Sequence, residues 1–171
     1  MKFETTMKHK FSIEIKWAIQ FSILTLVWMI IEKSVGLHDQ YISKQAIYTN
    51  LFAFVAIAIY VLALRDKKKN YYHNKMDWKQ GFLSGLVLSF IIAVLSPLVQ
   101  YITFTFITPN FFANIIEYAV SHKIQTQAQA ETFFNLKSYL LQGIFGALSM
   151  GVITAAMVAF VLKTKDNPNE K

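Results

Sequence analysis

The sequence has no cysteine, and this absence excludes several kinds of site. None of its 171 residues can form a disulfide, a thiolate metal ligand, a catalytic thiol or a palmitoylated cysteine. Charge is also scarce, since 16% of the residues are charged, against roughly 25% in soluble domains. The charges fall in short clusters separated by four long apolar stretches, which is typical of a polytopic membrane protein.

Motifs that carry catalysis or bind metals are missing as well. The sequence contains no nucleophile motif, no phosphate-binding glycine loop and no paired-carboxylate signature. Its four histidines, His9, His38, His73 and His122, do not have the spacing of a metal site. We therefore expect no catalytic residue, no metal site and no cofactor, and we do not expect an enzyme.

The apolar stretches predict an all-α fold with four transmembrane helices. Their approximate spans are 15–35, 47–64, 81–107 and 139–162. A helix rises about 1.5 Å per residue, so about 20 residues cross a hydrocarbon core of about 30 Å. We expect one membrane domain over residues 1–171, polytopic, with a short helical outer cap at 109–137, between the third and fourth helices. An apolar stripe and a capping box formed by Thr126 and Gln129 favour helices in that cap.

The distribution of basic residues predicts the orientation in the membrane. Thirteen of the 17 Lys and Arg residues lie before or at the start of the first span, between the second and third spans, or after the fourth. The two remaining loops hold only Lys33, Lys44, Lys123 and Lys137. Loops rich in Lys and Arg stay on the cytoplasmic side of a membrane. We therefore expect a bacterial inner (cytoplasmic) membrane protein with both termini in the cytoplasm.

One basic stretch mixes cations with aromatic side chains, a pattern found on nucleic-acid surfaces and at the ends of membrane hairpins. The cations are Arg65, Lys67, Lys68 and Lys69, and the aromatic residues that follow are Tyr71, Tyr72 and Trp78. Because the stretch joins two apolar spans, we interpret it as the cytoplasmic end of a hairpin. We expect the lipid bilayer as a partner, with anionic head groups at the four cations, and no nucleic acid.

Small residues recur at every fourth position in the third and fourth spans. The third span has Gly81, Gly85, Ser89 and Ala93, and the fourth has Gly143, Ala147, Gly151, Ala155 and Ala159. Residues four apart share a helix face, and small side chains let two transmembrane helices approach closely. The two series predict helix packing, either between these two spans or across a homodimer.

Four polar residues are expected at similar depth near the outer side of the bundle. They are Glu32, Asn50, Gln100 and Gln142. One interpretation is an outward-facing polar pocket, and the other is a set of hydrogen bonds between helices, each contributing about 0.6 kcal/mol. No ionisable residue is expected at the middle of the bilayer, where it would indicate function by default.

The segments "EKSVGLHD", "MDWKQGFLSG", "LSPLVQYI" and "ITPNFFANIIEYAV" resemble a family of small bacterial membrane proteins, chiefly from Bacteroidota, known as domain of unknown function 4199. The resemblance runs from about Ile13 to Leu162. It implies a four-helix inner-membrane protein, and it implies no catalytic or binding residue.

These observations favour a non-enzymatic protein that assembles in the envelope, as a homo-oligomer or with another membrane protein. The alternative is a small-solute transporter or a ligand-binding membrane protein that uses the outer polar cluster. An enclosed cavity lined by Asn50, Gln100 and Gln142 would favour the alternative. The same amides facing lipid, or bonded in pairs across a dry seam, would favour assembly.

Overall fold

The computed structural model describes residues 2–164, with side chains from residue 10 onward. In this part of the chain the secondary structure is entirely helical. In chain order the elements are α1 (Lys2–Ser34), α2 (Ile42–Tyr48), the 3-10 helix η1 (Thr49–Leu51), α3 (Phe52–Asn70), α4 (Trp78–Ile102), the π-helix η2 (Thr103–Ile107), α5 (Phe111–Ser121), α6 (Gln127–Phe133) and α7 (Leu136–Leu162).

Four segments of the described chain are long and apolar enough to cross a membrane. They are Lys10–Ser34, Ile42–Asn70, Trp78–Ile107 and Leu136–Leu162. Helices α5 and α6 follow the third of them, in the region expected to form a cap. The fold class is therefore confirmed: an all-α polytopic membrane protein with four spanning helices and a short helical cap. The second segment begins earlier than the sequence predicts, because α2 and η1 lead into α3 without a break.

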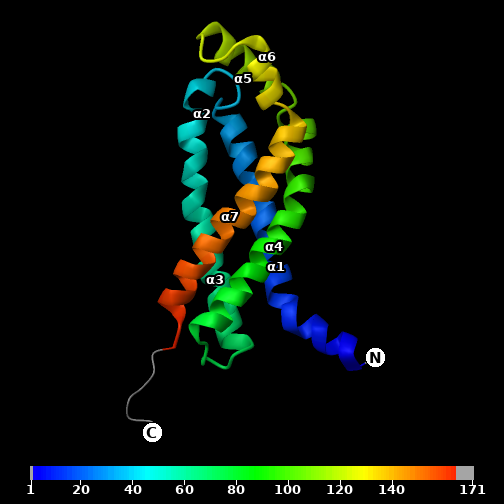
Figure 1. Cartoon of the computed structure of the whole chain (residues 1–171), viewed down its shortest axis with the longest axis vertical. Coiled ribbons are helices and arrows are strands. Elements are labelled where there is room, and N and C mark those ends of the chain that lie inside the picture. Colours follow the sequence, from blue (N-terminus) through cyan, green and yellow to red (C-terminus); the bar gives the residue numbers. More distant parts are fainter. Residues whose placement is uncertain (1, 165–171) are drawn as a thin grey trace.

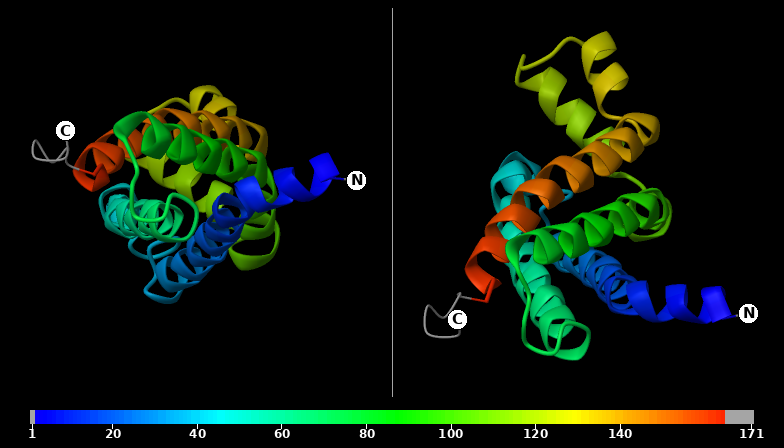
Figure 2. Two further views of the ribbon diagram at one scale, coloured as in Figure 1. Left: turned by 90° about the horizontal axis from the view of Figure 1, so that it is seen from below. Right: turned by 60° about the horizontal axis from the view of Figure 1, so that its bottom comes forward.

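The spanning helices form two layers, α4 with α7 and α1 with α3 (Figure 2). The most extensive interhelix contact joins α4 to α7, and each layer also packs against the other through α1 on α4 and α3 on α7. Helices α2, α5 and α6 lie at one end of the bundle, called here the cap end (Figure 1). The loop 71–77 lies at the opposite end with the start of α1 and the end of α7, and we call this the hairpin end.

Side-chain capping explains where two of these helices begin. At the start of α4 the Asp77 carboxylate accepts the backbone N–H of Gln80 at 2.8 Å, and the Gln80 amide oxygen accepts the N–H of Asp77 at 3.0 Å. The capping box expected from Thr126 and Gln129 is present at the start of α6. Each box satisfies backbone donors that a helix start leaves without an intrahelical partner.

Proline lies inside α4, and a neighbouring hydroxyl compensates for it. Pro97 has no N–H, so the carbonyl of Ala93 loses its normal partner four residues on. The Ser96 hydroxyl donates to that carbonyl at 3.0 Å. In a membrane this matters because water is not there to satisfy a free carbonyl. Ser96 therefore lets the helix continue past a proline.

Small residues line the contact between α4 and α7. A Cβ added to Gly85 would lie 2.4 Å from the Cβ of Ala155 and 3.1 Å from its Cα. A Cβ on Gly81 would lie 3.1 Å from the Cβ of Ala159. On the other helix, a Cβ on Gly151 would lie 2.5 Å from the Ser89 hydroxyl oxygen. The two series of small residues thus face each other within one chain, where the helix backbones come close together.

Candidate functional site: a cavity inside the bundle

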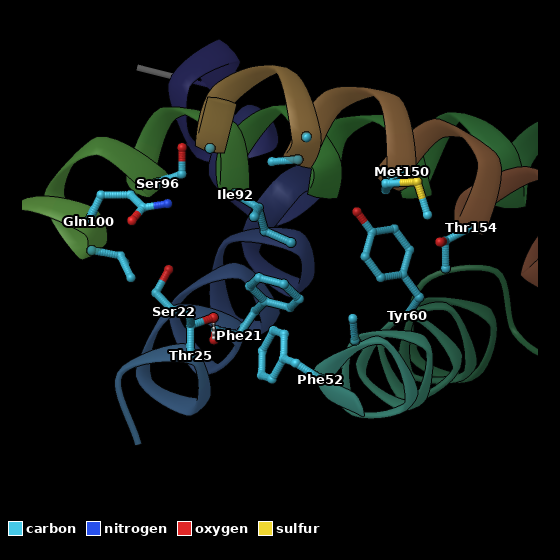
Figure 3. A pocket seen from close by; sticks show the side chains of 16 residues that line it. Phe21, Ser22, Thr25, Phe52, Tyr60, Ile92, Ser96, Gln100, Met150 and Thr154 are labelled. Carbon is cyan, nitrogen blue, oxygen red and sulfur yellow. Dashed lines mark hydrogen bonds between the residues drawn. The ribbon is translucent and has the colours of Figure 1, made fainter. Parts of the chain in front are cut away.

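A cavity of about 250 Å³ lies between the two helix layers, near the middle of the bundle (Figure 3). It is open on the side where the wall residue Met150 is 62% exposed. All four spanning helices contribute to its wall. The lining residues are Phe21, Ser22, Thr25, Phe52, Ala56, Tyr60, Ile92, Ser96, Val99, Gln100, Gly143, Gly146, Ala147, Met150, Gly151 and Thr154. None of them carries a charge, so the cavity suits a neutral occupant.

Aromatic side chains form the wall on the α1–α3 layer. The rings of Phe21 and Phe52 meet edge to face, with their centroids 5.6 Å apart. Figure 3 shows both rings opposite the α4–α7 layer, with Ile92 pointing toward them. A cavity with such walls excludes charged groups and favours contact with apolar or aromatic molecules.

Most hydroxyl groups in the wall are already occupied as donors. The Ser22 hydroxyl donates to the Ala18 carbonyl at 3.0 Å, and the Thr25 hydroxyl donates to the Phe21 carbonyl at 2.9 Å. Ser96 donates to its own helix in the same way. Each hydroxyl oxygen keeps a lone pair, so these groups can still accept a hydrogen bond from an occupant.

Gln100 and Thr154 are wall residues whose side chains make no hydrogen bond within the described chain, and the Gln100 amide offers more donors and acceptors. Its side-chain amide lies at one end of the cavity, and Thr154 lies at the other (Figure 3). The amide nitrogen lies 3.0 Å from the position of a Cβ added to Gly143, so the absence of a side chain there gives Gln100 its room. Within the described chain the amide makes no hydrogen bond, although it can donate two and accept two.

Open space borders α7 in the middle of the wall. A Cβ added to Gly146 would meet no atom within 4 Å, unlike one added to Gly143 or Gly151. Gly146 is therefore the position where a larger side chain would enter the cavity without a clash.

The bundle is closed between the cavity and the hairpin end. The Tyr60 and Ser89 hydroxyls bond at 2.8 Å, and the Ser89 hydroxyl also bonds the Gly85 carbonyl at 2.7 Å. Buried apolar side chains follow, among them Leu64 and Leu88. The cavity therefore ends at this apolar layer and does not reach the hairpin end.

A buried ion pair lies beyond that apolar layer. Glu14 of α1 and Lys67 of α3 are each 2% exposed, and their charged groups are 2.9 Å apart. The Ser84 hydroxyl donates to the Glu14 carboxylate at 2.6 Å, and the Lys67 ammonium also donates to the Lys10 carbonyl. The Lys67 ammonium lies 4.0 Å from the centre of the Tyr71 ring.

Tyr72 follows in the loop outside the membrane spans. Burial of its hydroxyl raises the pKa of Tyr72 above the ordinary value for tyrosine.

This network corrects one of the lipid contacts expected from the sequence. Lys67 was expected to meet anionic head groups, but it is buried and paired with Glu14. The Lys68 ammonium donates to the Leu162 carbonyl at 2.7 Å. Arg65 and Lys69 are exposed.

The four residues expected to form an outer polar cluster do not come together, which corrects that expectation. Asn50 is exposed, and its amide donates to the Ala46 carbonyl of the same helical segment at 2.6 Å. Gln142 is exposed as well, and Glu32 is buried at the end of α1. Only Gln100 lines the cavity. The depth of these residues was inferred from their positions along the helices, but the direction in which each side chain points was not.

Two charged groups on α1 are buried in ways that the sequence analysis did not predict: Glu14 was not singled out, and Glu32 was expected in the outer polar cluster. The sequence nevertheless carries a signal for both. Glu14 and Glu32 belong to a series spaced by three or four residues, Glu14, Ala18, Phe21, Thr25, Trp28 and Glu32. This spacing places them on one helix face. Ala18 is fully buried and Phe21 lines the cavity, so the face points inward. An acidic residue on a face of this kind predicts a buried partner.

Among the described residues, no group of three His, Cys, Asp or Glu side chains is arranged to hold a metal ion.

No curated protein and no solved structure matches the chain. A family does match residues 16–164, which is most of the chain and includes all the residues of the cavity wall. The chain belongs to that family, described as "Protein of unknown function (DUF4199)".

Proposed function

We propose that this protein is a non-enzymatic membrane protein that binds a small, neutral, largely apolar molecule inside its bundle. The observation that supports it is the cavity of about 250 Å³ with an uncharged wall and one amide free to bond. A cavity of about 150 Å³ lined by apolar side chains holds benzene, so this one has room for a substituted ring or a short chain. A charged molecule would lose its hydration without gaining a partner there.

Gln100 supports a more specific description of the occupant. Its amide can donate to a carbonyl or hydroxyl oxygen and accept from a hydroxyl or amide. The hydroxyl oxygens of the wall can accept one further hydrogen bond. A molecule with one neutral polar group, held at the Gln100 end, uses these groups while its apolar part meets Phe21 and Phe52.

Assembly with itself or with another envelope protein remains the competing prediction. Its strongest argument was the small-residue series, which could serve a dimer seam. Because Gly85 and Gly151 contact the partner helix of the same chain, those residues are already in use. Two of the three amides, Asn50 and Gln142, are exposed, which is the arrangement expected for assembly. The cavity and the use of the small residues within one chain are the observations that favour the ligand-binding role over it.

We place the protein in the inner membrane of a bacterium, with both termini and the hairpin end in the cytoplasm. The support is the excess of Lys and Arg in those segments. Reporter fusions after Asp66 and at the C-terminus should report the cytoplasm, and one at Gln127 should report the outer side. The opposite result at any one of the three positions would contradict this orientation.

Photolabelling tests the binding site directly. A suitable probe is a benzyl alcohol whose benzene ring carries a trifluoromethyl diazirine group. It is a neutral molecule with one aromatic ring and one hydroxyl. The protein in lipid nanodiscs is illuminated with the probe, and labelled residues are located by peptide mass spectrometry. We expect labelling of Phe21 and Ile92 to saturate as the probe concentration rises. Labelling of the lipid-facing Phe160, which is 63% exposed, should rise in proportion to it.

The matched variant is Gly146→Leu, which fills the cavity from a position with open space around it. It should remove the saturable labelling of Phe21 and Ile92 and leave labelling of Phe160 unchanged. Labelling of Phe21 that is not saturable, or that is the same in Gly146→Leu, would refute the proposal.

A further inference from the structure

Apart from the cavity, the cap end contains a buried acid–base pair. Glu32, near the end of α1, is 1% exposed, and His38, in the loop before α2, is 0% exposed. His38 Nε2 lies 3.0 Å from Glu32 Oε2. The indole N–H of Trp28 donates to the other carboxylate oxygen, Oε1. The carboxylate thus has a nitrogen partner on each of its oxygens.

The other ring nitrogen of His38 has no partner. Nδ1 is buried and makes no hydrogen bond in the described structure. A neutral imidazole carries one N–H, and the carboxylate, an acceptor when ionised, takes it at Nε2. Nδ1 is then a bare lone pair inside the protein. With Glu32 ionised, the pair carries one uncompensated negative charge.

The surrounding elements bring further charged and titratable side chains to this end of the bundle. They are Lys33 of α1, Asp39 of the loop, Lys44 of α2, Glu117 and Tyr118 of α5, and Tyr139 of α7. None of them is hydrogen-bonded or ion-paired to Glu32 or His38 in the described structure. The Lys33 ammonium donates instead to the Ile107 carbonyl. The negative charge of the pair therefore has no cation bonded to it.

We propose that Glu32 and His38 form a proton-binding site. A proton from water adds to the lone pair of His38 Nδ1, no bond is broken, and the neutral imidazole becomes an imidazolium beside the Glu32 carboxylate. The net charge of the pair changes from −1 to zero. Histidine is the side chain whose charge changes between about pH 5 and pH 8.

Proton uptake at His38 Nδ1 also adds a hydrogen-bond donor to the site. The new N–H is a buried donor without an acceptor, and such donors are rare in folded proteins. The His38 ring must turn, or an acceptor must approach it. Its ring meets Phe111 of α5 edge to face, with centroids 5.2 Å apart. The Asn114 amide of α5 donates to the His38 carbonyl and to the Asp39 carboxylate, both at 2.9 Å. Because both the ring and the carbonyl of His38 contact α5, a movement of His38 also moves this cap helix.

Trp28 reports on the site, because its indole bonds the same carboxylate. Replacing Trp17 and Trp78 with phenylalanine leaves Trp28 as the single tryptophan of the chain. Its fluorescence is recorded in nanodiscs between about pH 8 and about pH 5. We expect one transition with the slope of a single proton, absent in His38→Gln and unchanged in His122→Gln. His122 is an exposed histidine at the end of α5 and serves as the matched control.

A second measurement needs no tryptophan replacement. In the full chain labelled with ¹⁵N-histidine, the Nδ1 signal lost in His38→Gln identifies His38, and it should move across the same pH range from the value of a bare nitrogen to that of an N–H. A Trp28 emission that does not change with pH, a transition that persists in His38→Gln, or a Nδ1 signal that does not move would each overturn the proposal.

Discussion

Replacing Gly85 with alanine tests how closely α4 and α7 approach each other. The new Cβ would lie 2.4 Å from the Cβ of Ala155, a distance that real Cβ contacts do not reach, so one helix has to shift. Overpacking of this kind costs about 1–3 kcal/mol. Alanine also favours a helix over glycine by about 0.5–1 kcal/mol, which partly offsets that cost.

The matched control is Gly146→Ala in the facing helix. Its Cβ enters open space, so only the gain in helix propensity remains. Both variants gain the same helix propensity. The difference between their free energies of unfolding is therefore the overpacking cost in Gly85→Ala. We therefore expect Gly85→Ala to have a free energy of unfolding about 1–3 kcal/mol below that of Gly146→Ala.

An exchange of residues separates the clash from other effects of the substitution. In the double variant Gly85→Ala, Ala155→Gly the two Cβ atoms no longer meet, and one methyl group remains in the contact. The Cα of residue 155 is still 3.1 Å away, so we expect partial recovery. The assay is unfolding in mixed micelles with increasing SDS, followed by circular dichroism. A Gly85→Ala protein at least as stable as Gly146→Ala would show that the helices do not pack as described.

Three further predictions concern buried polar groups at the hairpin end and in the cavity floor. Lys67→Met leaves the buried Glu14 carboxylate without a cation, with only the Ser84 hydroxyl bonded to it, and should lower the free energy of unfolding by about 3–5 kcal/mol. The exposed Lys69→Met should change it little. Adding Glu14→Gln to Lys67→Met should restore most of the loss, and no recovery would contradict the ion pair. Tyr60→Phe removes the hydroxyl bonded to Ser89 and should cost about 1 kcal/mol in the same unfolding assay, and an unchanged value would show that this bond adds nothing.

Much of the architecture could be predicted because it depends on properties that repeat along the chain. The length of each apolar stretch defines the spans, and the four-residue spacing of Gly81, Gly85 and Ser89 identifies the face of α4 that meets α7. Pairing between distant residues could not be read in the same way. Nothing local links Glu14 to Lys67, although each lies on the inward face of its helix.

The cavity and the outer polar residues show a second limit. Counting along a helix gives the depth of Asn50 and Gln142, but not the rotation of the helix about its axis, and both side chains point outward. The cavity is the space left where the α1–α3 layer does not fill the groove of α4 and α7. Its existence depends on the sum of side-chain volumes from four helices, a quantity without a pattern in any one of them.

The capacity of the cavity to hold a neutral molecule is tested most directly by the effect of the same diazirine alcohol, kept in the dark, on stability. A molecule that binds only the folded protein raises the free energy of unfolding by about 2.7 kcal/mol at 100 times its Kd. We predict that the probe raises the unfolding midpoint of the unmodified protein in nanodiscs until saturation and leaves that of Gly146→Leu unchanged. An equal effect on both proteins, or no effect on either, would contradict a binding site in the bundle.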